Sequence, residues 1–372
     1  MQKKISPKNT EEIVFINAHR KQAWPFRFAF KFLYITAIIF IICPFTDCAE
    51  ENLHKEILKR VSMVNIDSIG AHLRRLQDFK TRYALSDSCR AAEKYLFEYF
   101  NNCGIDSVWY DTVFHKGTAL RNVFASIKGN VDPDAVIILC AHIDATSDTP
   151  LDCAPGAEDN GSGVSVVMEA ARILADAKLP YTLLLIGFSG EDIGLVGSKA
   201  TAESMIKSKK RICTLLNLDM VGWIGGAFGI KVLCDSSTIY LARIECDAAL
   251  EYSNMFPEII VRNPLPSDNY YFQIAGYPCL ANIERFEHDS AGYKWYHTCE
   301  DTVGNLSLPL IQEVAKTVIA TIIKIMEIPA PPANVERGLY FQSFKRLYHQ
   351  WKSSFKLYLF QKENTRLHMI SG

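Results

Sequence analysis

The sequence predicts an α/β fold with three layers, in which a mostly parallel, mixed and twisted sheet carries helices on both faces. Three continuous apolar segments, Val136–Cys140, Tyr181–Phe188 and Thr214–Leu218, have the length and composition of buried strands. Segments with helical apolar spacing lie between them, and strand–helix–strand alternation is typical of parallel strands joined by crossover helices. Because such strands are buried on both sides, helices must cover both faces of the sheet.

Upstream of the first apolar strand, residues 50–118 are predicted to be helical. Apolar residues recur at helical spacing in two places, at Leu53, Ile57, Val61 and Val64 and at Ala92, Tyr95, Leu96 and Tyr99. The turn sequence Asn101–Gly104 ends the second helix. Asn122–Ile127 then reads as a strand, and Asp132–Asp134 as part of the turn before Val136.

Downstream, helical and strand patterns continue to alternate. Gly163–Leu179 has an apolar helical face and ends before Pro180, and a further helix is expected from about Ser198 to Ser208. The remaining predicted strands are Lys231–Cys234, Glu258–Val261 and Cys279–Ile283. The remaining predicted helices are Leu241–Tyr252, Asn269–Ile274 and Leu308–Glu327.

The composition is that of an ordinary globular protein, with 49% hydrophobic and 22% charged residues. A formal net charge of -1 gives no indication of a nucleic-acid partner. The eleven cysteines contain no CxxC pair, which argues against a zinc ribbon or a small disulfide framework. Cys140, Cys234 and Cys279 lie in apolar strands, where a buried thiol is expected.

The first 49 residues are predicted to be a leader. Basic residues precede an apolar run of about 14 residues, Phe32–Phe45, which is shorter than the roughly 20 that a membrane-spanning helix needs but suits a signal-peptide core. We therefore expect export to a periplasmic or extracellular location, or retention by a membrane anchor. Export would permit disulfides, although the sequence does not pair the cysteines.

A basic, aromatic tail, residues 331–372, follows the predicted domain of residues 50–330. Phe344, Tyr348, Trp351 and Phe355 recur at helical spacing among lysines and arginines, which indicates an amphipathic helix. Packing on the domain or self-association is the first interpretation. Membrane association through this tail or through the leader is the alternative.

Every buried strand of the predicted parallel sheet ends in side chains that can bind a metal. These residues, with two more from connecting loops, are His142, Asp144, Asp159, Glu191, Asp192, Asp219 and His297. Like-charged carboxylates buried together cost several kcal/mol unless a cation or protons neutralise them. A pair of divalent metals would do so, and imidazole with carboxylate ligands and no thiolate suits zinc, with cobalt or manganese as alternatives.

Each of these residues also has an ordinary structural interpretation. His142 could be a hydrogen-bonded histidine at a strand end, Asp159 a helix cap, and Glu191-Asp192 a solvated charge pair. Asp219 could cap a turn and His297 could lie on the surface. Their ordered occurrence at successive strand ends favours a metal site, whereas His288 and Asp268 carry no assigned role.

Over about Asn122–Leu306 the chain resembles the zinc peptidases of family M28, which include aminopeptidases and glutaminyl-cyclase-like members. The matching segments are His142–Asp144, Gly156–Gly163, Gly190–Ser198, Asn217–Gly222 and Tyr296–Thr298 with Asp301-Thr302. The resemblance implies two zinc ions, one bound by His142 and Asp219, the other by Asp192 and His297, with Asp159 bridging them. It also implies Glu191 as general base, Asp144 as the carboxylate that orients His142, and Tyr296 as a phenol that stabilises the oxyanion.

Two positions depart from the usual pattern of this family. Asp192 stands where most members have glutamate, so this ligand is one methylene shorter, and Asn269 replaces a histidine often found after Ser267-Asp268. We expect a variant site that still binds metal, and an altered substrate pocket.

The function expected from this resemblance is hydrolysis of peptides by a zinc-dependent exopeptidase that removes N-terminal residues through a metal-activated water. One alternative is a single-zinc glutaminyl cyclase on the same fold. The other is a non-catalytic binding protein, against which the presence of every predicted ligand argues. The sequence does not predict the oligomeric state.

Overall fold

The computed structural model describes residues 50–263, 267–284 and 292–330. A compact unit begins at Lys55, and of the preceding unit only residues 50–54, which are helical, are described. The predicted leader, the C-terminal tail and His288 lie outside the described residues. Across the described ranges, no helix has both the length and the apolar character needed to cross a membrane.

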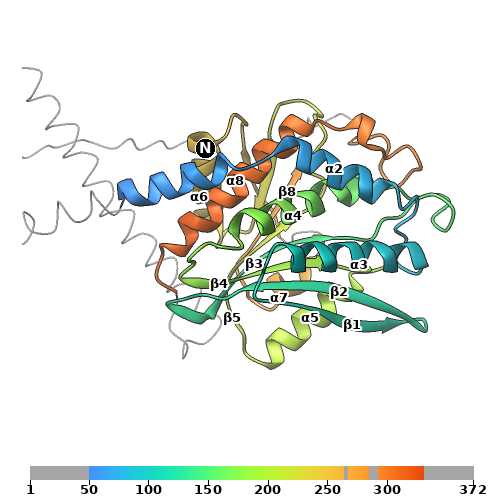
Figure 1. Cartoon of the computed structure of the whole chain (residues 1–372), viewed down its shortest axis with the longest axis horizontal. Coiled ribbons are helices and arrows are strands. Elements are labelled where there is room, and N and C mark those ends of the chain that lie inside the picture. Colours follow the sequence, from blue (N-terminus) through green and yellow to red (C-terminus); the bar gives the residue numbers. More distant parts are fainter. Residues whose placement is uncertain (1–49, 264–266, 285–291, 331–372) are drawn as a thin grey trace, which may run out of the picture. The chain divides into compact units, whose positions relative to one another are not determined.

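Eight strands of the described chain form one sheet, in the order β1-β2-β4-β3-β5-β8-β6-β7 (Figure 1). The strands are β1 (Ser107–His115), β2 (Thr118–Ile127), β3 (Asp132–His142), β4 (Tyr181–Phe188), β5 (Arg211–Leu218), β6 (Ile230–Cys234), β7 (Glu258–Val261) and β8 (Cys279–Glu284). The central strands β4, β3, β5 and β8 are parallel. β2 and β6 run antiparallel to the two ends of this central group.

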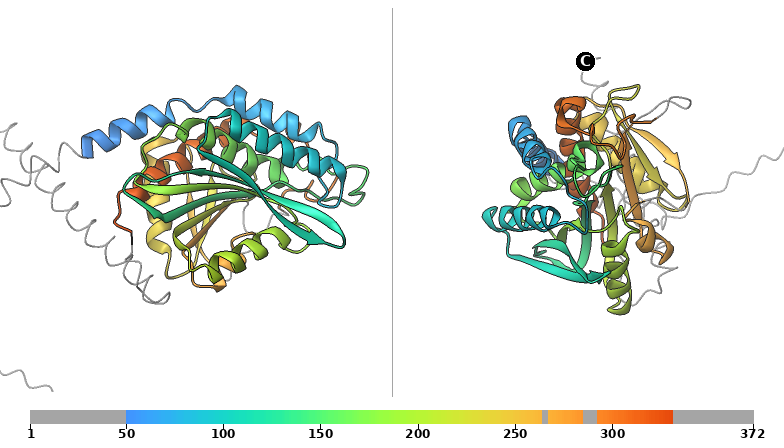
Figure 2. Two further views of the ribbon diagram at one scale, coloured as in Figure 1. Left: turned by 60° about the horizontal axis from the view of Figure 1, so that its bottom comes forward. Right: turned by 90° about the vertical axis from the view of Figure 1, so that its right-hand side faces the viewer.

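Helices cover both faces of the sheet, as Figure 2 shows. On one face lie α2 (Ile66–Gln77), α3 (Asp87–Asn102), α4 (Gly163–Leu174) and α8 (Leu308–Met326), and α6 (Ile239–Tyr252) packs against α8. On the other face lie α5 (Val196–Lys207) and α7 (Tyr270–Ile274), which contact each other. The predicted three-layer α/β fold is confirmed.

The core explains why the central strands read as continuous apolar runs. Every residue of β4 is buried, and so is every residue of β3 from Ala135 onward. α8 is the longest helix of the described residues, and most of its side chains are buried. Its N-cap is Ser307, whose hydroxyl accepts a hydrogen bond from the Leu310 amide at 3.3 Å. Burial on both faces selects apolar side chains at every position rather than at alternate ones.

The prediction that residues 50–118 are helical throughout was wrong for its last part. Residues 107–115 form β1, whose side chains alternate in exposure and which pairs antiparallel with β2. Lys116 and Gly117, with φ angles of 49° and 81°, form the tight turn between the two strands. β-Branched and aromatic residues on a half-exposed strand explain the difference, because they favour a pleated surface over a helix.

Two further boundaries differ from the prediction. Asp132–Asp134 belongs to β3 instead of a turn, and the pairing with β4 shifts register between Asp132 and Val136. α4 ends at Leu174, five residues before the predicted Leu179. Neither difference moves the carboxyl end of a central strand.

The order in which successive strands are added to the sheet changes direction at β3. From β3 it passes through α4 to β4 on one side, and later through α5 to β5 on the other side. The carboxyl ends of β3, β4, β5 and β8 therefore lie at one edge, with a crevice where the strand order switches. This crevice is where open α/β sheets bind their ligands.

Candidate metal centre

The five predicted metal ligands come together at this edge. His142 is the last residue of β3, Asp192 lies in the loop after β4, and Asp219 directly follows β5. Asp159 lies in the turn Ala157–Ser162 that precedes α4, where its backbone is not helical, and His297 lies in the loop before α8. Residues separated by up to about half the chain therefore form a single cluster.

The distances divide the five side chains into two groups that share Asp159. His142 Nε2 lies 3.2 Å from Asp159 Oδ1 and 3.4 Å from Asp219 Oδ1. His297 Nε2 lies 3.1 Å from Asp159 Oδ2 and 3.1 Å from Asp192 Oδ1. Asp159 thus presents one carboxylate oxygen to each group, which is the arrangement of a bridging ligand.

The two groups have the chemistry and spacing of metal sites. In each group of three, one ligand atom per residue lies within 4.8 Å of the others. Asp192 Oδ2 is buried and has no hydrogen-bond partner among the described residues, so it is available as a ligand. Two imidazoles and three carboxylates without a thiolate suit zinc, and the residues therefore fit a pair of zinc ions.

The electrostatics of the cluster show how strongly its carboxylates attract positive charge. Burial alone would lower the pKa of both histidines, but Asp219 and Asp159 raise the pKa of His142 well above its usual value. The carboxylates of Asp159 and Asp192, each 3.1 Å from His297 Nε2, raise the pKa of His297 to about 9. Although burial opposes it, His142 and His297 lower the pKa of Asp159. A divalent metal would take over the neutralising role of the histidine protons.

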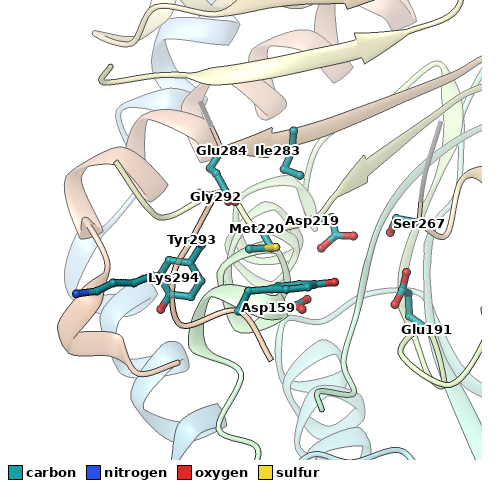
Figure 3. Close-up of a pocket in the computed structure, with 11 residues that line it drawn as sticks. Asp159, Glu191, Asp219, Met220, Ser267, Ile283, Glu284, Gly292, Tyr293 and Lys294 are labelled. Carbon is teal, nitrogen blue, oxygen red and sulfur yellow. The ribbon is translucent and has the colours of Figure 1, made fainter. Parts of the chain in front are cut away.

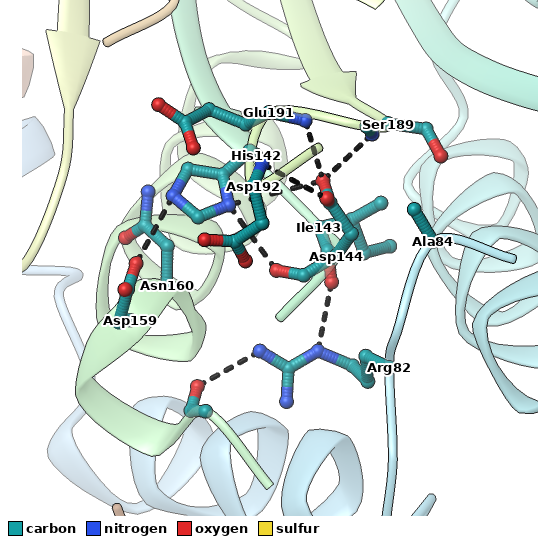
Figure 4. Close-up of polar contacts among 12 residues, drawn as sticks. Arg82, Ala84, His142, Ile143, Asp144, Asp159, Asn160, Ser189, Glu191 and Asp192 are labelled. Atoms are coloured by element: carbon teal, nitrogen blue, oxygen red, sulfur yellow. Dashed lines mark hydrogen bonds and ion pairs between the residues drawn. The ribbon is translucent and has the colours of Figure 1, made fainter. Parts of the chain in front are cut away.

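Asp144 organises the loop that carries Glu191 and Asp192. Its carboxylate accepts hydrogen bonds from three successive backbone amides, those of Gly190, Glu191 and Asp192, at 2.8, 3.1 and 3.3 Å (Figure 4). His142 Nδ1 instead lies 3.1 Å from the backbone carbonyl of Asp144 and 3.9 Å from its carboxylate. The Asp144 residue therefore orients His142 chiefly through its carbonyl, whereas the sequence predicted its carboxylate for this contact.

A cavity of about 430 Å³ opens over the cluster. Asp159, Asp219 and Glu191 point into it, whereas Lys294 turns away (Figure 3) and its ammonium lies 4.1 Å from the centre of the Trp295 ring. Burial raises the pKa of Glu191 well above its usual value; His142 opposes this shift, while Asp219 and Asp268 add to it. Glu191 is thus a carboxyl group with a high proton affinity beside the candidate ligands.

Tyr296 lies at the rim of this cavity. Its side chain is 50% exposed, and its ring stacks on the His297 imidazole with a centroid distance of 3.7 Å. Burial and the nearby Asp159 raise the pKa of its phenol above the usual value. The phenol therefore keeps its proton at neutral pH and can donate a hydrogen bond to a ligand in the cavity.

Arg82 and Asp301 support the site, although the sequence predicted a role for neither. Arg82 is fully buried, and its guanidinium donates to the carbonyls of Ile143 and Gly156, each at 2.8 Å. The Asp301 carboxylate accepts from the backbone amides of Glu158 and Asp159, at 2.8 and 3.0 Å. Asp301 belongs to a segment that matches the family pattern, so the sequence pointed to it. No pattern around Arg82 indicates that this arginine is buried.

The residues around Asn269 differ from expectation. Asn269 is fully buried and accepts a hydrogen bond from Asn217 Nδ2 at 3.3 Å, whereas Ser267 lines the cavity. Asn269, which replaces the usual histidine, is therefore buried next to the cavity and does not line it. Asp268 is also buried, and burial, partly opposed by His142, raises its pKa to about 7.

Two histidines and three carboxylates at the switch point of such a sheet place the protein among metal-dependent enzymes. The model of peptidase family M28 matches residues 122–322, more than half of the 372 residues, and the chain belongs to this family. The predicted relationship to zinc peptidases is thereby confirmed, and with it an enzyme that acts on peptides and depends on zinc.

Curated relatives agree with this assignment. A probable zinc metalloprotease from Pyrenophora teres is 34% identical over 191 residues, which cover 45% of this chain and 40% of the relative. Another, from Pyrenophora tritici-repentis, is 28% identical and covers 76% and 78% of the two chains. Leucine aminopeptidase 1 from Fusarium vanettenii is 26% identical, with 78% and 77% covered. The chain thus spans less than half of the first relative and more than two thirds of the other two.

Solved structures show the same fold. An aminopeptidase from Legionella pneumophila superposes with a TM-score of 0.62 at 21% identity, over 73% of this chain and 74% of that one. A glutaminyl cyclase from Porphyromonas gingivalis superposes with a TM-score of 0.59 at 23% identity, over 70% and 99%. These likenesses establish the fold, which both classes of enzyme share.

Proposed function

We propose that this chain is a di-zinc aminopeptidase that removes residues from the N-terminus of peptides. The observation that carries the proposal is the pair of three-residue groups that share Asp159, with Glu191 facing the same cavity. Aminopeptidases among the relatives support the exopeptidase activity. Two zinc ions for each chain fit the two groups.

The ligand assignment follows from the two groups. His142 and Asp219 would hold one zinc, Asp192 and His297 the other, and Asp159 would contact both. Bound zinc supplies a Lewis acid that polarises the substrate carbonyl and lowers the pKa of a water toward roughly 7. The shorter side chain of Asp192 comes within 3.1 Å of His297 Nε2, so it reaches the position that this assignment requires.

Proton transfer is the role of Glu191. Its carboxylate would accept a proton from the attacking water and pass that proton to the nitrogen of the departing amine. The high proton affinity that burial gives Glu191 makes its carboxylate a stronger base toward the attacking water. The Tyr296 phenol would donate a hydrogen bond to the substrate oxygen as negative charge develops there, and Asp144 would hold the loop that carries Glu191.

Glutaminyl cyclisation at a single zinc is the alternative activity. The likeness to bacterial glutaminyl cyclases supports only the shared fold. The second group, Asp159, Asp192 and His297, is complete, which favours two metals over one. A non-catalytic role is disfavoured because no predicted ligand is missing.

The decisive experiment combines metal analysis with two kinds of substrate. The full chain reconstituted with zinc should contain two zinc ions and release amino acids from aminoacyl-nitroanilides. Glu191→Gln should retain both zinc ions and lose about 10²–10⁴-fold in kcat, which is the usual contribution of a general base. One zinc ion with a cyclised product from glutaminyl peptides would establish the alternative, and absence of bound zinc would contradict both.

We further propose that the protein is exported. The support is the basic residues and the apolar run Phe32–Phe45, which resemble a signal peptide. N-terminal sequencing of the protein from an exported fraction should give a start near Cys48 or Ala49. Recovery of the complete N-terminus in a membrane fraction would indicate an anchor instead.

A further inference from the structure

Two cysteines that lie far apart in the sequence meet beside the metal centre. Cys153 and Cys299 are 146 residues apart, yet Cys299 Sγ lies 3.2 Å from the backbone carbonyl of Cys153 and 3.3 Å from Thr149 Oγ1. The two thiols are also close enough to hydrogen-bond with each other. Both are free thiols in the structure.

The backbone holds both cysteines in place. The Cys153 amide donates to the Thr149 carbonyl at 2.9 Å, and the next amide, that of Ala154, donates to the Lys80 carbonyl at 2.9 Å. On the other side, Cys299 lies in a turn in which the Asp301 amide donates to the Thr298 carbonyl at 3.2 Å. The meeting of the two thiols is therefore built into the packing of two ordered loops.

Exposure distinguishes this pair from most cysteines of the described residues. Cys153 and Cys299 are half-buried, so a redox partner can reach them, whereas the strand cysteines Cys140, Cys234 and Cys279 are buried. Burial and the hydrogen bond with Cys299 raise the pKa of Cys153 to about 11.

The position of the pair gives it a consequence for the metal centre. Cys299 follows His297 by two residues, and Cys153 precedes Asp159 by six. His297 has a positive φ of 55°, and 35% of its side chain is exposed. On its C-terminal side the loop is tied to the Asp159 segment by the hydrogen bonds of Asp301. A bond at Cys299 would add a covalent attachment close to His297.

We propose that Cys153 and Cys299 form a redox-sensitive pair that closes to a disulfide and fastens the His297 loop to the loop leading into Asp159. Each thiol loses its proton and one S–S bond forms. The two electrons pass to a disulfide, either a small molecule such as glutathione disulfide or a protein oxidoreductase, which leaves as two thiols. The covalent link does not depend on the proposed function, whereas its effect on zinc rests on the proposed role of His297.

The link is tested directly by peptide mapping. The zinc-loaded full chain is equilibrated with glutathione disulfide, trapped with iodoacetamide, digested and analysed by mass spectrometry. We expect a pair of peptides joined through Cys153 and Cys299, which separates on reduction and also forms in the matched control Cys246→Ser. Alkylation of both cysteines, or their joining to other cysteines, would overturn the proposal.

The consequence for the metal centre is tested by zinc release. Transfer of zinc to a chromogenic chelator should be several-fold slower from the oxidised chain than from the reduced chain. In Cys153→Ser, the same oxidising treatment should leave the rate unchanged. Equal rates in oxidised and reduced wild-type protein would refute the fastening of His297, even if the disulfide forms. Zinc-loaded protein that carries the link but is inactive on every peptide would count against the proposed function alone.

Discussion

At the scale of single residues, the site depends on carboxylates that bind backbone amides. The Asp144 carboxylate accepts hydrogen bonds from three backbone amides of the loop that carries Glu191 and Asp192. The Asp301 carboxylate accepts hydrogen bonds from two backbone amides of the segment that carries Asp159. A buried carboxylate with several amide donors fixes a loop more tightly than a single hydrogen bond does. The candidate ligands are thus positioned by residues that do not themselves belong to the two metal groups sharing Asp159.

Asp144→Asn tests this positioning role. The amide side chain has the same shape, but its NH₂ group cannot accept a hydrogen bond, so part of the 190–192 loop loses its anchor. We expect zinc affinity or kcat/KM to fall about 10–100-fold, as is usual for residues that support metal ligands. Zinc titration and aminopeptidase assays measure the effect, with the exposed Asp148→Asn as control. An Asp144→Asn enzyme with wild-type kcat/KM would show that the 190–192 loop keeps its conformation without the Asp144 carboxylate.

Glu245 gives a prediction about stability and pH. It is fully buried in α6, and burial raises its pKa to about 7, although the amide of Asn282 donates to it at 2.9 Å and acts in the opposite direction. Because its pKa is higher in the folded than in the unfolded state, its contribution to stability is fully present below about pH 4.5 and is lost as pH rises through about 7. The loss amounts to about 3 kcal/mol at alkaline pH.

Glu245→Gln should therefore remove this pH dependence. The variant should unfold at higher denaturant concentration than the wild type at pH 8 and at a similar concentration at pH 5. Urea denaturation at both pH values measures this, and the exposed Glu203→Gln serves as the matched control. A variant that is less stable than the wild type at pH 8 would contradict the buried-acid explanation.

At the scale of elements, Asn122 of β2 joins the two ends of the Glu191 loop. Its Oδ1 accepts from the Ser189 amide at 3.0 Å, and its Nδ2 donates to the Gly197 carbonyl at 3.1 Å. The end of β4 and the start of α5 are thereby held together. Gly197 permits this close approach, since a Cβ there would lie 2.1 Å from Asn122 Oδ1 and 2.5 Å from the Ser189 carbonyl oxygen.

Gly197→Ala is expected to separate α5 from the end of β4. Forcing a methyl group into this packed contact should destabilise the fold by about 1–3 kcal/mol and lower kcat, because the loop between the two ends carries Glu191. The matched control is Gly304→Ala, where an added Cβ meets nothing within 4 Å. Thermal unfolding and kcat are measured for both variants. Equal Tm and kcat in the two variants would show that the close approach of Gly197 to Asn122 does not constrain the loop.

At the scale of the whole molecule, the metal centre joins the ends of three strands, the turn before α4 and the loop before α8. Zinc bound there would hold together the ends of β3, β4 and β5, the turn Ala157–Ser162 and the loop before α8. A ligand that binds only the folded state stabilises it according to its concentration and affinity. Metal content should therefore control the stability of the entire described unit.

Removal of zinc is the test at this scale. Treatment with a chelator should lower Tm, and zinc at about 100 times its Kd should restore about 2.7 kcal/mol for each site. In Asp159→Asn the gain from added zinc should shrink, because both groups lose their shared ligand. Calorimetry of the metal-free and zinc-loaded chains measures the difference. A Tm that does not respond to zinc in the wild-type chain would argue against a structural contribution of the metal.

The sequence by itself predicted the central sheet, the order of its parallel strands along the chain, and the side chains that the structure brings together at one edge of that sheet. It could do so because strands buried on both faces are continuous apolar runs and polar residues directly after them share one edge. The prediction missed β1, although its β-branched and aromatic residues and its alternating exposure favour a strand. The pairing with β2 is what makes this assignment certain.

Only the tertiary structure decided which oxygen faces which nitrogen. The division into two groups around Asp159, the use of the Asp144 carboxylate for backbone amides, the burial of Arg82 and the meeting of Cys153 with Cys299 all depend on contacts between distant segments. Such contacts leave no periodic pattern in the sequence, because each is set by how separate loops pack over one sheet edge. Residue types therefore predicted the chemistry, and packing assigned each residue its partner.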